Sequence, residues 1–62
     1  MKLTLVRDSD DLRWYKFKLN NLQEQLVMEI GKDFDIEGNP HEILMIQYNK
    51  SGLSGLIVVQ ST

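Results

Sequence analysis

Two C-terminal segments, residues 43–48 and 55–60, are apolar at almost every position, in a chain of only 62 residues. Side chains alternate between the two faces of a β-strand, so a strand that is apolar at successive positions has to be covered on both sides. Asn49 and Gly52 lie between the segments and accept the positive φ of a hairpin loop, which predicts that the segments pair. A chain this short has little else with which to cover both faces, and the surplus apolar surface points to a partner.

The small size of the chain leads to the same expectation. A domain of about 60 residues buries only about 60% of its unfolded surface, and such domains commonly add disulfides, a metal or oligomerisation. The sequence contains no cysteine, which removes disulfides and thiolate metal sites together. We therefore expect a single domain over residues 1–62 that gains stability by self-association.

Residues 1–20 are predicted to form a β-hairpin. Leu3 and Leu5 alternate with polar residues, as in a half-buried strand, and the run from Asp8 to Asp11 favours a turn. The second strand would place three apolar side chains on its core face: Tyr15, Phe17 and Leu19.

Residues 22–34 admit two interpretations. Asn20 or Asn21 is placed as a helix N-cap, with Glu24 three residues after Asn21. The apolar residues Leu22, Leu26, Ile30 and Phe34 recur at helical spacing. A strand through Leu26, Met28 and Ile30 is the competing interpretation. We predict the helix, because Gln, Glu, Leu and Met are good helix formers.

The resulting order of elements, ββαββ, predicts an α+β fold with a small antiparallel four-stranded sheet and one helix on one face. The helix would bury one set of strand residues: Leu44, Ile46, Tyr48, Ile57 and Val59. The opposite set would stay exposed and is predicted to form a partner or dimer interface: Ile43, Met45, Leu56 and Val58. The alternative is an all-β five-stranded small barrel, which would turn both faces inward.

A second candidate surface combines an aromatic ring with cations. Strand alternation places Trp14, Lys16 and Lys18 on one face, and Arg7 could extend it. Single-stranded nucleic-acid binders use such a layout of aromatic and basic side chains. The net charge of −2 argues against this function. Lysines that protect a solvent-facing strand from edge pairing would give the same pattern.

The sequence carries no strong signature of catalysis or of a cofactor. Asp33, Asp35 and Glu37 have the first three oxygen-ligand positions of an EF-hand loop, but Leu44 stands where that loop needs its glutamate. A calcium-binding acidic loop is therefore a weak alternative. His41 is the only histidine and is expected in a loop, with no neighbouring nucleophile, so we predict no catalytic role for it.

These observations predict a small non-enzymatic protein that binds another protein stoichiometrically, as a regulator or inhibitor, and forms a homodimer. A single-stranded nucleic-acid-binding module is the alternative function. No apolar run approaches the roughly 20 residues of a membrane span, and residues 1–20 lack the pattern of a signal peptide. We therefore expect a cytoplasmic protein that does not bind membranes.

Overall fold

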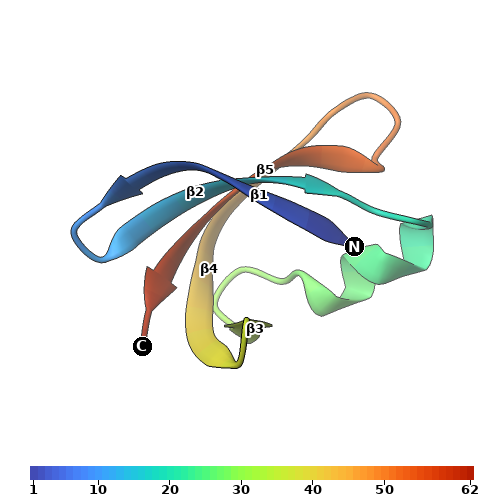
Figure 1. The fold of residues 1–62 in the computed structure, drawn as a ribbon. Helices are drawn as coiled ribbons and strands as arrows, with labels where there is room; N and C mark the ends of the chain where they lie inside the picture. Colours follow the sequence, from blue (N-terminus) through green and yellow to red (C-terminus); the bar gives the residue numbers. More distant parts are fainter.

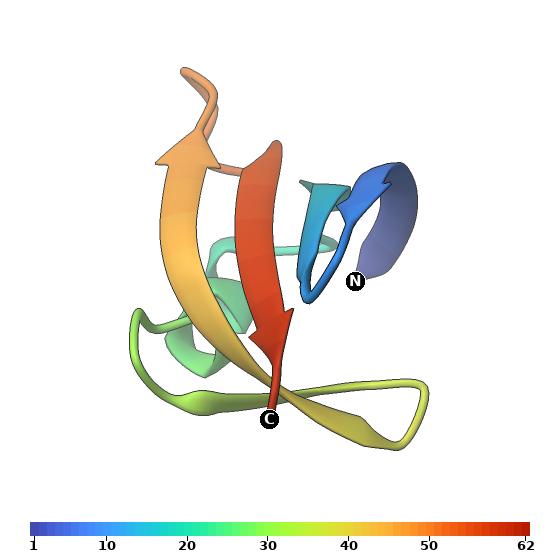
Figure 2. The ribbon, with the colours of Figure 1, turned by 90° about the vertical axis from the view of Figure 1, so that its left-hand side faces the viewer.

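The computed structural model describes all 62 residues and shows one antiparallel sheet with the strand order β1-β2-β5-β4-β3 (Figure 1). A short 3-10 helix, η1, connects β2 to β3. The elements are β1 (Lys2–Ser9), β2 (Leu12–Lys18), η1 (Leu22–Val27), β3 (Asp33–Ile36), β4 (Asn39–Tyr48) and β5 (Ser54–Ser61). The sheet is strongly twisted, and η1 lies on one side of it (Figure 2).

The predicted α+β fold is wrong. Residues 33–36 form a fifth strand, and the only helix is a six-residue 3-10 segment, so the protein is nearly all β. The alternative all-β barrel has the correct number of strands. It differs in closure, because β1 and β3 remain the two edges of an open sheet.

Of the two predicted N-cap residues the structure has Asn21, although the helix that follows it is short. The Asn21 side chain accepts a hydrogen bond from the Glu24 N–H at 3.2 Å, and the Glu24 carboxylate accepts one from the Asn20 N–H at 2.7 Å. The helix ends because Met28 is extended and turns its side chain into the core. Phe34 then pairs with His41 as part of β3. Pairing with β4 through a two-residue turn brings Phe34 and Ile36 into the core, and their burial outweighs the helical periodicity.

The two apolar C-terminal segments pair as predicted, as the antiparallel strands β4 and β5. In the loop between them the Asn49 N–H donates to the Ser54 carbonyl at 2.8 Å, and Gly52 has a φ of 74°. The β3–β4 hairpin closes with the two residues Glu37 and Gly38, both at positive φ, as in a type I′ turn.

A β-bulge in β4 decides which side chains enter the core. Ile43 pairs with Val59 and Met45 pairs with Val58, so Leu44 is an extra residue in β4. Ile43 consequently points into the core and is fully buried, whereas Leu44 is 38% exposed. The predictions for these two side chains are therefore wrong, because a strict alternation along β4 does not allow for an inserted residue.

The core lies on the side of the sheet that faces η1 and the residues after it. Its residues come from every strand but β1, together with Leu19 and Met28, and Met1, Leu3, Ile46 and Leu53 pack against it. The nine buried members are Tyr15, Phe17, Leu19, Met28, Phe34, Ile36, Ile43, Ile57 and Val59. The core face predicted for the second strand, with Tyr15, Phe17 and Leu19, is confirmed.

Candidate functional site

The face of the sheet that points away from the core carries two rows of directly paired residues. Residues paired across antiparallel strands lie on the same face, so each row crosses β1, β2, β5 and β4. We call this surface the outer face. Its rows are Arg7, Trp14, Val58 and Met45, and Thr4, Lys16, Leu56 and Gln47. A third pair, Lys2 with Lys18, extends it along β1 and β2.

The two surfaces that the sequence predicts separately are one surface in the structure. Pairing between β2 and β5 places Trp14 beside Val58 and Lys16 beside Leu56. The outer face thus contains the entire predicted nucleic-acid face and three of the four residues of the predicted interface. Ile43 is excluded because it is buried. Val58 is itself only 9% exposed, which leaves little apolar surface there for a protein contact.

The basic side chains of the outer face have no ion-pair partners. Two of the seven basic residues are paired elsewhere, Arg13 with Asp8 at 3.6 Å and Lys32 with Glu29 at 2.8 Å. The other five, which form no ion pair, are Lys2, Arg7, Lys16, Lys18 and Lys50. Lys2 and Lys18 even lie directly opposite each other, an arrangement of like charges that is destabilising in a sheet.

A single aromatic ring lies among these cations. The Arg7 guanidinium lies over the indole of Trp14, 4.8 Å from the ring centroid, in a cation–π contact. The outer face therefore presents two planar groups one above the other, flanked by lysines.

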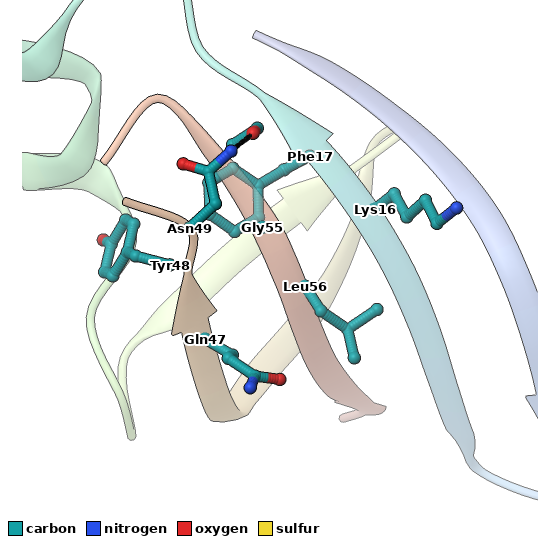
Figure 3. A pocket seen from close by; sticks show the side chains of 8 residues that line it. Lys16, Phe17, Gln47, Tyr48, Asn49, Gly55 and Leu56 are labelled. Atoms are coloured by element: carbon teal, nitrogen blue, oxygen red, sulfur yellow. Dashed lines mark hydrogen bonds between the residues drawn. The ribbon is translucent and has the colours of Figure 1, made fainter. Parts of the chain in front are cut away.

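A hollow of about 470 Å³ opens beside the second row, between β2, β5 and β4 (Figure 3). Gly55 is one of its lining residues, and a side chain at this position would meet the Gln47 carbonyl and the Phe17 ring. Phe17 and Tyr48 form one wall, with ring centroids 5.5 Å apart in an edge-to-face contact. Lys16, Gln47, Asn49, Ser54 and Leu56 supply the rest of the lining.

No protein-family model, curated protein or solved structure matches the chain. Its function is therefore inferred from its own side chains.

A second candidate surface, which sequence reasoning missed, lies in the connection between β2 and β3. Four large apolar side chains there are 58–81% exposed, and we call them the apolar connector: Leu22, Leu26, Val27 and Ile30. The helical interpretation turned Leu22, Leu26 and Ile30 towards the core. In the structure Met28 alone among residues 22–30 is buried, and no pattern in the sequence marks this difference.

The apolar connector is anchored to the rest of the protein by polar contacts. The Gln25 side chain donates to the Gly52 carbonyl at 2.7 Å, and the Gly31 N–H donates to the Ile43 carbonyl at 2.9 Å. The N-terminal ammonium lies 2.8 Å from the Glu24 carboxylate, next to η1 (Figure 1). This ammonium, together with the Asn20 N–H, lowers the pKa of Glu24.

The remaining candidates belong to neither the rows of the outer face nor the apolar connector. Asp33 and Asp35 are exposed on β3 and Glu37 is in the following turn; no three His, Asp or Glu side chains gather closely enough to hold a metal ion. His41 lies in β4 rather than in a loop and is 1% exposed. Its Nδ1 is 2.9 Å from the Asn39 carbonyl, and its Nε2 has no hydrogen-bond partner. No helix of the structure is long and apolar enough to cross a membrane.

Proposed function

We propose that the protein is a small stoichiometric binding protein, a regulator or inhibitor rather than a catalyst, and that it forms a homodimer through the apolar connector. The exposure of the connector is the observation that supports this proposal. The exposed surface of its four residues adds up to that of about two and a half fully exposed apolar residues. A patch of this kind marks interaction sites.

The size of the folded chain supports self-association. The chain exposes 4371 Å² when folded. An unfolded chain of 7.2 kDa would expose about 10,400 Å², so folding buries only about 58% of its surface. Full burial of a large apolar side chain stabilises a protein by about 1.5–3 kcal/mol. In a monomer the side chains of the connector gain only a small part of this free energy, and a contact with a second copy would supply more of it.

The charges next to the connector suit a second copy of the same chain. A two-fold contact sets a patch against itself, so a net charge within the patch would repel the partner. Glu24 is paired with the N-terminal ammonium, and Glu29 is paired with Lys32. The connector therefore carries no unpaired charge that a two-fold contact would bring together.

The outer face is less suited to this contact. A two-fold contact centred on its cationic part, with Arg7, Lys16 and Lys18, would bring cations against cations, and Val58 has little surface left to bury. The role predicted for Met45, Leu56 and Val58 as a dimer interface is therefore replaced by the connector in this proposal.

Sedimentation over a range of concentrations tests the proposal. The wild-type chain should have twice the mass of the 7.2 kDa monomer at micromolar concentration. Leu26→Asp should sediment as a folded monomer, because it puts an unpaired carboxylate into the contact. Met45→Asp, on the outer face, is the matched control and should remain a dimer. A wild-type monomer at every concentration would refute the proposal, as would a dimer broken by Met45→Asp and not by Leu26→Asp.

A further inference from the structure

We infer that the outer face binds single-stranded nucleic acid. This inference uses a different surface from the apolar connector and does not depend on the dimer. Its basis is the distribution of charge: four of the five basic side chains that form no ion pair lie on the outer face, and Lys50 follows Asn49, which lines the hollow. The protein carries a net charge of −2, so this concentration of free cations on one side is a local feature.

The lysines form a strip that suits one phosphate backbone. Lys2, Lys18 and Lys16 lie on the adjacent strands β1 and β2. Neighbouring strands are about 5 Å apart, so the cations cover a narrow track along the strands rather than a broad surface. The opposed pair of Lys2 and Lys18 is unfavourable in the free protein, and a phosphate between the two ammonium groups would remove the repulsion.

The Arg7–Trp14 pair supplies a stacking platform beside this track. Unpaired bases stack on aromatic side chains and on guanidinium planes, and both kinds of group are present here in contact. Stacking of this kind requires a base that is free of its complementary strand, which is why the ligand is a single strand.

The hollow offers a place for a neighbouring nucleotide. Lys16, which lines it, is two residues from Trp14 along β2, or about 7 Å. Its volume of about 470 Å³ is large enough to admit a base, and the amide of Gln47 supplies both donors and an acceptor for base edges. The Asn49 amide is hydrogen-bonded to Ser51 and Ser54 and shapes the rim of the hollow.

Acidic residues set the limits of the binding surface. Glu42 and Asp33 are paired on the outer side at the start of β4 and β3, and Asp10 and Asp11 form the turn of the β1–β2 hairpin. A broad duplex laid across the sheet would approach these carboxylates, whereas a single strand along β2 towards the hollow avoids them. An acidic protein could neutralise the lysines but would leave the stacking platform and the hollow unused.

Titration with oligothymidine of about 15 nucleotides, a length within the usual site sizes, tests the inference. Trp14 is the only tryptophan, so its fluorescence reports directly on the platform. We expect quenching, a micromolar or lower Kd, and an affinity that falls with salt with a slope of about −0.7 for each phosphate contact. In the double variant Lys16→Ala, Lys18→Ala the slope should become shallower by about 1.4. Lys32→Ala, which removes a lysine that is paired with Glu29, is the control and should bind like the wild type.

Several results would overturn the inference. These are no binding in 50 mM salt by either fluorescence or anisotropy, equal affinity for a duplex, or unchanged affinity and salt slope in the double lysine variant. Polyglutamate that binds as tightly as the oligonucleotide would assign the face to an acidic protein instead. Leu26→Asp should bind the oligonucleotide with unchanged affinity per chain. The binding measurement therefore tests the outer face whether or not the chain forms the proposed dimer.

Discussion

The bulge in β4 can be tested by comparing two neighbouring residues that a regular strand would place the other way round. The perturbations are Ile43→Ala and Leu44→Ala. In the structure Ile43 is 0% exposed and packs in the core, whereas Leu44 is 38% exposed. The strict alternation that the sequence predicts for this strand, with Leu44, Ile46 and Tyr48 on the core side, would bury Leu44 and expose Ile43.

The magnitudes follow from the burial of each side chain. Ile43→Ala removes three carbons from a closed environment and should cost about 2–5 kcal/mol, which includes the cavity left behind. Leu44→Ala removes a side chain that is partly solvated and leaves a site open to water. It should cost about 1 kcal/mol, because only part of the transfer free energy of a leucine side chain is gained at a partly exposed site. The total stability of a chain this short is about 3–9 kcal/mol, so the larger loss is a substantial fraction of it.

Urea unfolding followed by Trp14 fluorescence measures both effects. With a slope of about 1 kcal/mol/M, a difference of about 2 kcal/mol separates the two midpoints by about 2 M. If Ile43→Ala does not fold while Leu44→Ala does, the loss at Ile43 is the larger of the two and agrees with the register of β4. A loss for Leu44→Ala that equals or exceeds the loss for Ile43→Ala would refute the register of β4.

In a chain that begins at Met1, Glu24→Gln should lower the melting temperature at pH 7. As the pH falls, the Glu24 carboxyl group takes up its proton first in the unfolded chain, near pH 4.3, and in the folded chain only at its lowered pKa. The difference in melting temperature between the wild type and Glu24→Gln should therefore disappear as the pH falls through that lowered pKa. Equal melting temperatures at pH 7 would contradict the contact between Glu24 and the N-terminal ammonium. Gly55→Ala should destabilise the fold by about 1–3 kcal/mol in urea unfolding, because the new methyl group would meet the Gln47 carbonyl, and a neutral result would show that β4 and β5 are further apart. Gly38→Ala should cost about 1–2 kcal/mol because Gly38 has a φ of 80°, and an unchanged unfolding midpoint would argue against the type I′ turn.

Local signals in the sequence identified the features that depend on neighbouring residues. The N-cap at Asn21 with Glu24 is present because a cap requires only side chains and backbone groups within a few residues. The pairing of β4 with β5 follows from a short loop between two apolar segments. The buried side of β2, with Phe17 at its centre, follows from simple alternation.

The tertiary structure alone decided the features that depend on distant partners. Residues 33–36 became a strand because pairing with β4 places Phe34 and Ile36 in a core that includes side chains of the distant strands β2 and β5, and this burial outweighed the helical spacing of the segment. As a result Leu26 lies in solvent rather than in the core.

The candidate site shows the same division. Alternation along β2 was enough to group Trp14 with Lys16, because both lie on one strand. Only the pairing of β2 with β5 placed Val58 beside Trp14, and only the bulge moved Ile43 inside and kept Met45 outside. The sequence therefore determined the composition of each strand face, and the register between strands, which depends on the packing of the whole core, determined which faces became one surface.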